Sequence, residues 1–248
     1  MSNPRRKPRR AGARARPAAR RRRRPLAVRD EPTRERILAA ALEVFAERGF
    51  EGARTREIAE RAGVNLGLLA YYFDGKEPLW REAVSRAFEE LQRELGGLAA
   101  HGGPQPASER ERLEVLLRGF VRFVARRPAF MRLMNDEGKR DGPRMRWLAD
   151  RYVKPMAAAF RQAIERAQAQ GAVPAAPPAS LHYIALGAAG LLFSQAPECA
   201  YAMGVDPTSE GFAEAHADTV VRMLLGPPPP AGVSCDLGPG SGAQLTRC

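Results

Sequence analysis

The chain has 248 residues, of which 44% are hydrophobic and 27% are charged, and its formal net charge is +12. It contains no uncharged apolar run of 18 residues, so we expect no membrane-spanning helix. The only cysteines are Cys199, Cys235 and Cys248. Because they lack metal-ligand spacing, we expect neither a zinc site nor a disulfide scaffold.

Residues 1–30 carry the whole excess of positive charge, with thirteen Lys or Arg and one Asp, whereas the other 218 residues hold 27 basic and 27 acidic side chains. An unbroken arginine run from 20 to 24, several prolines and few large apolar residues predict a disordered arm. A basic arm of this kind can follow the phosphates of a nucleic acid or enter a minor groove. The alternative is an inert, solvated tail. The arm lacks the apolar stretch of a secretory signal, so we expect a cytoplasmic protein.

Residues 31–80 have the pattern of three short helices and the start of a fourth. In the first helix, apolar residues repeat at spacings of three and four, with Thr33 as a possible N-cap and Gly49 as the stop. The second helix begins near Thr55, another N-cap candidate, and ends at Gly63, which can adopt the left-handed conformation. The expected buried residues of these helices are Ile37, Leu38, Ala41, Leu42, Phe45, Ile58, Ala59 and Ala62.

A turn of only three residues, Gly63-Val64-Asn65, separates the second helix from a third over roughly 66–73. Asn65 is a good N-cap, and Val64 can pack on Leu69 as a hydrophobic staple. In a helix-turn-helix, the first helix braces against the DNA backbone and the second presents its exposed face to base edges in the major groove. The sequence therefore predicts a head that binds DNA, and a protein that acts by binding and not by catalysis.

On the third helix, Leu69 and Phe73 share the buried side, while Gly67 and Tyr71 face outward. The outward face is small and mostly apolar, so we expect little hydrogen-bonded base readout from it. Arg56 is the side chain best suited to contact guanine, whereas Thr55, Tyr72 and Lys76 suit phosphates. The predicted DNA-binding residues are Thr55, Arg56, Asn65, Leu66, Gly67, Leu68, Ala70, Tyr71, Tyr72 and Lys76.

About 50 residues of this region resemble the DNA-binding domain of the tetracycline-repressor (TetR) family. The resemblance lies in Arg-Glu-Arg-Ile-Leu (34–38), Thr-Arg-Glu-Ile-Ala-Glu-Arg-Ala-Gly-Val (55–64) and Leu-Ala-Tyr-Tyr-Phe-Asp-Gly-Lys-Glu (69–77). The family often has Tyr-Tyr-His-Phe at residues 70–73 and Ser at positions 65 and 75. The resemblance implies an all-helical homodimer, a variable C-terminal effector domain and repression relieved by a small ligand. A generic three-helix packing unit is the alternative.

Beyond the head, the pattern stays helical, and we expect a body of six or so helices over residues 81–226. A helix over 76–95 carries Trp80, Val84, Phe88, Leu91 and Leu95 at helical spacing, and a Gly/Pro-rich loop is expected over 96–107. The next helix starts at Ser108 and stops before Pro128, a short segment of apolar residues follows, and a long helix over 143–170 has a kink or restart at Pro155. Expected buried residues are Leu113, Leu116, Leu117, Phe120 and Val124, then Phe130, Met131, Leu133 and Met134.

Two final apolar helices, over 178–196 and 208–225, flank a connection from Pro197 to Pro207. In the resembled family the last two helices pair with their copies across a two-fold axis; the alternative is that they only complete the monomer core. A two-fold dimer requires a near-palindromic operator, with half-sites about 34–36 Å apart or a multiple of this. The predicted interface residues are Leu181, Ile184, Ala188, Leu191, Phe212, Thr219, Val220 and Met223.

Aromatic residues and Met in the middle helices predict an apolar pocket for a small, mostly apolar effector, although such residues also form ordinary cores. The predicted pocket residues are Phe120, Phe123, Phe130, Met134, Trp147, Tyr152 and Phe160.

The histidines, His101, His182 and His216, are far apart and lack a nucleophile, metal or phosphate-loop context, so we expect no enzyme activity, metal or cofactor. The Pro/Gly-rich tail over 227–248 is expected to be disordered. The sequence predicts a homodimeric, ligand-responsive transcriptional regulator, most simply a repressor, with duplex DNA, a second copy of itself and a small effector as partners. The alternative is a ligand-indifferent, architectural DNA-binding protein driven by the basic arm.

Overall fold

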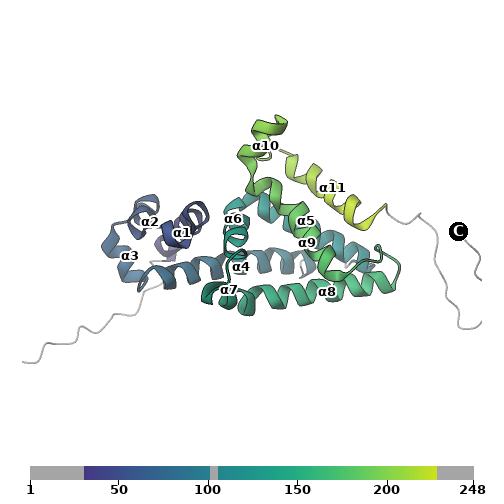
Figure 1. The fold of residues 1–248 in the computed structure, drawn as a ribbon, viewed down its shortest axis with the longest axis horizontal. Helices are drawn as coiled ribbons and strands as arrows, with labels where there is room; N and C mark the ends of the chain where they lie inside the picture. The colour runs from purple at the N-terminus through teal and green to yellow at the C-terminus, as the bar shows by residue number, and fades with distance from the viewer. Residues whose placement is uncertain (1–30, 101–105, 228–248) are drawn as a thin grey trace, which may run out of the picture.

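The computed structural model describes residues 31–100 and 106–227, which form helices joined by short turns (Figure 1). The predicted all-α fold class is confirmed. The predicted basic arm, the loop that holds His101 and almost all of the predicted tail lie outside the described residues. The elements are α1 (Glu31–Gly52), α2 (Thr55–Arg61), α3 (Leu66–Tyr72), α4 (Lys76–Ala100), α5 (Glu109–Arg126), α6 (Pro128–Glu137), α7 (Pro143–Leu148), a π-helical turn η2 (Ala149–Val153), α8 (Lys154–Ala169), α9 (Pro178–Ser194), α10 (Ala196–Met203) and α11 (Phe212–Leu225).

Helices α1 to α3 form the head, and all eight residues predicted to be buried in α1 and around α2 are buried. Gly49 interrupts α1 with a φ of 65°, and one further turn runs to Gly52. Two predicted caps are wrong. Thr33 lies inside α1, because a proline two residues into the segment already suits a helix start. Thr55 is the first residue of α2, and Arg54, whose backbone is extended, occupies the cap position without a capping side-chain hydrogen bond.

The long helix α4 connects the head with the body (Figure 1). Its predicted stripe is confirmed for Trp80, Val84, Phe88 and Leu91, which are buried. The helix continues through Gly96 and Gly97 to Ala100, which corrects the loop expected over 96–107. A glycine in a helix lowers helix stability by only about 1 kcal/mol relative to alanine. A helix that already has twenty residues before Gly96 can therefore continue through two glycines.

The body follows the predicted order of helices. Ser108 caps α5 by accepting a hydrogen bond from the backbone N–H of Glu111 at 3.1 Å. Leu116 and Phe120 are only partly buried, because Val121 and Phe123 take the central positions of α5. The predicted break at Pro155 is confirmed: the five-residue π-helical turn η2 ends just before α8. Proline provides no N–H for the helical ladder, which explains an irregular turn at this point.

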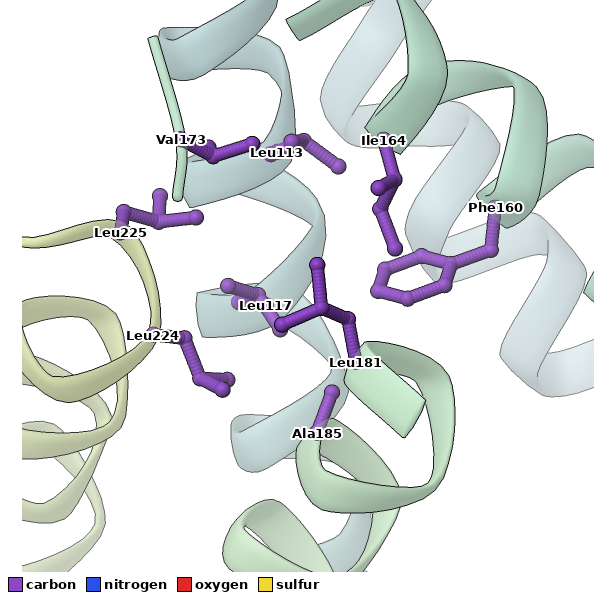
Figure 2. A pocket seen from close by; sticks show the side chains of 9 residues that line it. All are labelled: Leu113, Leu117, Phe160, Ile164, Val173, Leu181, Ala185, Leu224 and Leu225. Carbon is purple, nitrogen blue, oxygen red and sulfur yellow. The ribbon is translucent and has the colours of Figure 1, made fainter. Parts of the chain in front are cut away.

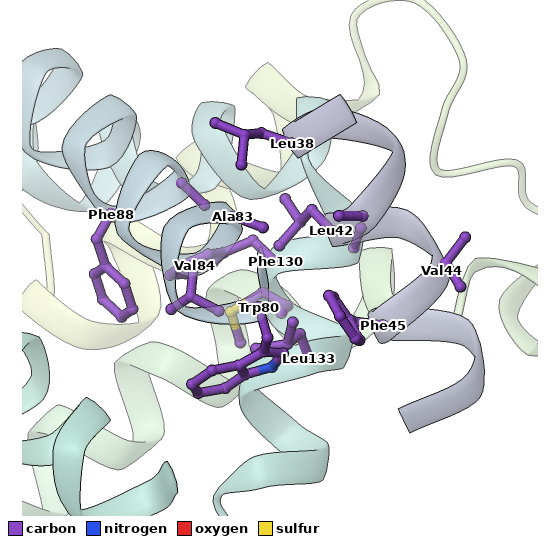
Figure 3. Close-up of a cluster of buried hydrophobic side chains, with 14 of the residues drawn as sticks. Leu38, Leu42, Val44, Phe45, Trp80, Ala83, Val84, Phe88, Phe130 and Leu133 are labelled. Carbon is purple, nitrogen blue, oxygen red and sulfur yellow. The ribbon is translucent and has the colours of Figure 1, made fainter. Parts of the chain in front are cut away.

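One continuous hydrophobic core spans the head and the body. Side chains of α1, α4 and α6 meet in it, with Leu42 and Phe45 facing Trp80 and Leu133 (Figure 3). The ring of Phe88 on α4 lies 4.4 Å, centroid to centroid, from that of Tyr152. The head is therefore held by the body through α4 and α6, and the boundary we expected after residue 80 falls inside α4.

The last helices differ from the prediction in one respect. The expected connection from Pro197 to Pro207 contains the helix α10. Its proline occupies the first turn, where a missing N–H costs nothing, and Gly204 with a φ of 65° ends it. Helix α11 packs along α5, where Arg122 pairs with Glu214 at 2.6 Å and Arg118 pairs with Asp218.

Candidate DNA-binding head and ligand cavity

The turn before α3 has the predicted geometry. Gly63 is left-handed, with a φ of 66°. The side-chain oxygen of Asn65 accepts a hydrogen bond from the backbone N–H of Leu68 at 2.7 Å, which confirms Asn65 as the N-cap. The backbone of Gly63 and the side chain of Asn65 are both held by local hydrogen bonds. Residues 63–65 therefore set the angle at which α3 leaves the turn.

Helix α3 buries one side and exposes the other. Leu69 and the following Phe73 are both 2% exposed. Gly67 and Ala70 lie on the surface, and Tyr71 and Leu66 are 57% and 42% exposed. The outward face is therefore exposed, small and mostly apolar, and a helix with such a free side can enter a major groove. Leu68 is partly exposed beside it.

Two arginines at the start of α2 have no partner among the residues that the structure describes. Arg54 and Arg56 are exposed, and neither makes an ion pair or a side-chain hydrogen bond to a described residue. Arg61, at the other end of α2, instead pairs with Glu47 at 2.7 Å, and this hydrogen bond holds the pKa of Glu47 below its usual value. Our sequence analysis missed Arg54, although its position directly before α2 was a usable signal.

Two of the predicted phosphate-binding side chains are engaged within the head. The Lys76 ammonium donates to the Glu51 carbonyl oxygen at 3.0 Å and lies 4.7 Å from the centre of the Phe50 ring. Tyr72 is partly buried, with its ring 5.7 Å from that of Tyr71. Lys76 thus ties the start of α4 to the end of α1. An ammonium has three donors, so the phosphate contact stays a prediction, as does that of the half-exposed Thr55.

Helices α9 to α11 present apolar side chains to solvent. Tyr183, Ile184 and Leu191 of α9 are 72%, 54% and 48% exposed. Met223 of α11 is 80% exposed, and α10 has no buried residue. Of the predicted interface residues, Ile184, Leu191, Thr219 and Met223 are exposed, whereas Leu181, Ala188 and Phe212 are partly buried. Val220 is 3% exposed and packs inside the subunit, because it lies on the side of α11 that faces α5 and α9; it is corrected to a core residue.

An apolar cavity of about 20 Å³ lies at the end of the body far from the head (Figures 1 and 2). Its lining is aliphatic except for one phenylalanine, and the residues come from α5, α8, α9, α11 and the segment after α8. They are Leu113, Leu117, Phe160, Ile164, Val173, Leu181, Ala185, Leu224 and Leu225. About one water molecule would fill this volume, so a ligand would have to separate the surrounding helices.

The structure does not bring the predicted pocket residues together around this cavity. Only Phe160 lines it. Phe123, Phe130 and Tyr152 are packed in the main core, and Phe120, Met134 and Trp147 lie partly buried against the same core. The lining escaped our sequence analysis because leucines at spacings of four are the most common pattern of any helical core.

The remaining polar residues form no reactive cluster within the described ranges. His216 Nε2 lies 2.7 Å from the Ala188 carbonyl oxygen, which links α11 to α9. Burial lowers the pKa of His182, whose ring packs 5.4 Å from that of Phe160. Across residues 31–100 and 106–227, no group of His, Cys, Asp and Glu could hold a metal ion. No helix of these ranges is both long and apolar enough to cross a bilayer.

Comparison with known proteins identifies the two parts of this architecture. A family model described as "Bacterial regulatory proteins, tetR family" matches residues 37–83, and one described as "Tetracyclin repressor-like, C-terminal domain" matches residues 110–224. The chain belongs to the TetR family. The resemblance seen in the head therefore extends to the body.

Individual TetR relatives match over parts of their length. The probable HTH-type transcriptional regulator YttP of Bacillus subtilis is 28% identical over 56% of this chain and 66% of its own length. The HTH-type transcriptional repressor KstR of Mycolicibacterium smegmatis is 33% identical over 41% of this chain and 48% of its own length. The chain thus spans less than two thirds of these curated relatives. Both relatives carry the names of regulators and not of enzymes.

Solved structures share the TetR fold over most of the chain. AibR, crystallised in complex with isovaleryl coenzyme A and operator DNA, superposes with a TM-score of 0.64 at 20% identity, over 79% of this chain and 99% of AibR. The ketosteroid transcriptional regulator KstR2 of Mycobacterium tuberculosis gives a TM-score of 0.62 at 20% identity, over 78% of this chain and 93% of KstR2. At these identities the likeness concerns the fold alone.

Proposed function

We propose that this protein is a homodimeric transcriptional repressor that binds a near-palindromic operator and is released by a small, mostly apolar ligand. The observation that carries the proposal is the free outward face of α3, with Tyr71 57% exposed on a helix whose entry angle Asn65 fixes. Arg56 of α2, which has no partner among the described residues, supplies a guanidinium, and this group suits a guanine edge. The TetR membership of head and body supports the same function.

The exposed apolar face of α9 and α11 supports the homodimer. Ile184, Leu191 and Met223 are large apolar side chains exposed on two helices that contact each other, and exposed apolar surface of this kind is typical of an interaction site. Pairing with a second copy would bury this face and place the two α3 helices on successive major grooves of a duplex.

The cavity between α5, α8, α9 and α11 supports the ligand part of the proposal. Its aliphatic lining favours an apolar compound. Since the cavity is small, a ligand would stabilise a state in which these helices are further apart, and differential affinity for that state is what would release DNA.

Selection of bound duplexes from a random DNA pool, followed by footprinting, tests the proposal. We expect one enriched near-palindrome and a discrete footprint at physiological salt. The competing candidate, a ligand-indifferent architectural protein, is favoured by the charge of residues 1–30. It would give broad protection without an enriched sequence and would lose binding as salt is added. That second result would refute the repressor.

A further inference from the structure

We infer that the effector carries a carboxylate, which the buried Arg110 binds while the apolar chain of the same molecule occupies the cavity. This inference rests on the proposed ligand-released function and specifies its ligand class as monocarboxylates with an apolar chain. It starts from Arg110 on α5, which is 8% exposed and is the only Lys or Arg buried to this degree among the described residues.

The guanidinium of Arg110 is held by main-chain carbonyl groups. Nη1 donates to the Ala172 oxygen at 3.0 Å and to the Leu225 oxygen, and Nη2 donates to the Gly226 oxygen at 2.5 Å. Arginine has five N–H donors. Within the described residues, two of these five N–H groups, Nε–H among them, are left without an acceptor and can donate to a carboxylate.

The charge of Arg110 has no counterion in the described part of the chain. The neighbouring Glu109 pairs with Arg166 at 3.2 Å and with Arg112 at 3.8 Å, and no acidic side chain pairs with Arg110. The carbonyl end of α11 provides a partial negative charge, which makes the burial tolerable. A full negative charge would be the better partner, because a buried cation is stabilised most by a hydrogen-bonded anion.

Arg110 does not itself line the apolar cavity, but its acceptors and its neighbours on α5 adjoin the lining. Leu113 and Leu117, which line the cavity, follow Arg110 on the same face of α5 at spacings of three and seven residues. Two of the three acceptors adjoin the lining directly, since Val173 follows Ala172 and Leu225 is itself a lining residue (Figure 2). A cation near an aliphatic cavity matches an amphipathic molecule with an acidic head.

The same contacts explain how such a ligand would act. Arg110 fastens the last residue of α11 and its cap to α5, so a carboxylate that engages Arg110 competes with the end of α11. The chain, entering a cavity of about 20 Å³, would push α11 away from α8 and α9. Because α11 contributes Met223 to the proposed dimer face, the ligand would favour a changed distance between the two heads.

The test uses the full chain and two probes of equal chain length, octanoate and octan-1-ol, with binding measured by isothermal titration calorimetry. We expect octanoate to bind saturably and at least tenfold more tightly than octan-1-ol. Arg110→Gln keeps N–H donors for the carbonyl groups and removes the charge, so the two probes should then bind within about twofold of each other. Arg112→Gln, two residues away on the same helix and exposed, is the matched control and should keep the wild-type ratio.

Equal binding of the two probes to the wild-type protein, or no saturable binding of octanoate, would overturn the inference without any variant. An unchanged octanoate preference in Arg110→Gln would overturn it as well. If Arg110→Gln does not fold, Arg110→Lys replaces it: it keeps the charge but not the guanidinium donors, and should lose about tenfold in octanoate affinity with octan-1-ol unchanged. Operator selection with the ligand-free protein tests the proposed function separately, so a discrete operator with no octanoate preference would refute only this inference.

Discussion

At the residue scale, the head combines an almost uncharged α3 with free cations at the start of α2. Tyr71, Gly67 and Ala70 supply shape and apolar contact but no pair of donors that distinguishes one base. Arg54 and Arg56 are the exposed guanidinium groups beside them that remain unpaired among the described residues. Specific hydrogen bonds from this head should therefore depend on few side chains.

Arg56→Ala should cost about 1–3 kcal/mol of operator binding and relax the preference at one guanine in each half-site. The measurement is the affinity for the selected operator, for operators changed at single positions and for random duplex, at one salt concentration. Arg54→Ala is the matched control, since it removes the same charge two residues earlier and should weaken all duplexes alike. If Arg56→Ala also weakens operator and random DNA by the same factor, Arg56 does not contact a base.

At the element scale, the junction between the head and the body depends on Arg144 of α7. Its guanidinium lies 3.9 Å from the centre of the Phe50 ring at the end of α1. It also pairs with Glu137 of α6 at 3.3 Å and with the exposed Glu51 at 3.4 Å. Because the Glu137 side chain is only 4% exposed, this carboxylate depends on Arg144 for its charge compensation.

Arg144→Met should lower the free energy of unfolding by about 2 kcal/mol, a value reduced from that of a fully buried pair because the Arg144 side chain is 23% exposed. Adding Glu137→Gln should restore part of this loss, since the stranded charge is then gone. Glu51→Gln is the control and should change stability by less than about 0.5 kcal/mol. Urea unfolding of the wild type, Arg144→Met, Glu137→Gln, the double variant and the control measures these differences; additive losses of the two single variants in the double variant would show that the two residues are not coupled.

The exposed face of α9 and α11 leads to a second prediction at this scale. Met223→Asp replaces an apolar side chain that is 80% exposed by a charged one. Because the position is exposed in the subunit, the subunit should fold normally, whereas the charge in the proposed interface should dissociate the homodimer. Light scattering coupled to gel filtration, with circular dichroism as the check on folding, measures both effects. Gln162→Asp on the exposed side of α8 is the control and should leave the dimer intact. A dimeric Met223→Asp protein would place the interface elsewhere.

At the scale of the whole molecule, charge is distributed unevenly along the chain. The thirteen basic residues and one Asp of 1–30 account for the net charge of +12, and they precede α1, the first helix of the head. Contacts between such residues and phosphates would raise the affinity for every duplex and make it depend on salt.

Deletion of residues 1–24 should lower the affinity for operator and random DNA by similar factors. It should also flatten the plot of log affinity against log salt by about 0.9 for each phosphate contact that is lost. Titrations at four salt concentrations measure the slope. Replacing all five arginines from 20 to 24 by glutamine keeps the length of the arm and should have part of the same effect; an unchanged slope in both proteins would mean that the arm is an inert tail.

Local patterns in the sequence were sufficient for the head and for the order of the helices. The Gly63-Val64-Asn65 turn and the buried stripes of α1 and α4 depend on helical periodicity and on backbone preferences of neighbouring residues, which act over a few positions. The errors at this level were also local. Gly96 and Gly97 predict a loop, and Pro197 predicts part of one, but all three lie in helices. The reason is that the helix-breaking tendency of these residues is weak near a helix end or in a first turn.

Only the tertiary structure decided which apolar residues form the core, the cavity or the free surface. Phe123, Phe130 and Val220 have the same local pattern as residues that line the cavity or face solvent, and their packing partners lie on other helices. The role of Arg110 is the clearest case, since its acceptors are 62 to 116 positions away in the chain. The periodicity of apolar residues in the sequence shows which side of a helix is apolar. Whether that side is buried depends on which other segments of the chain pack against it.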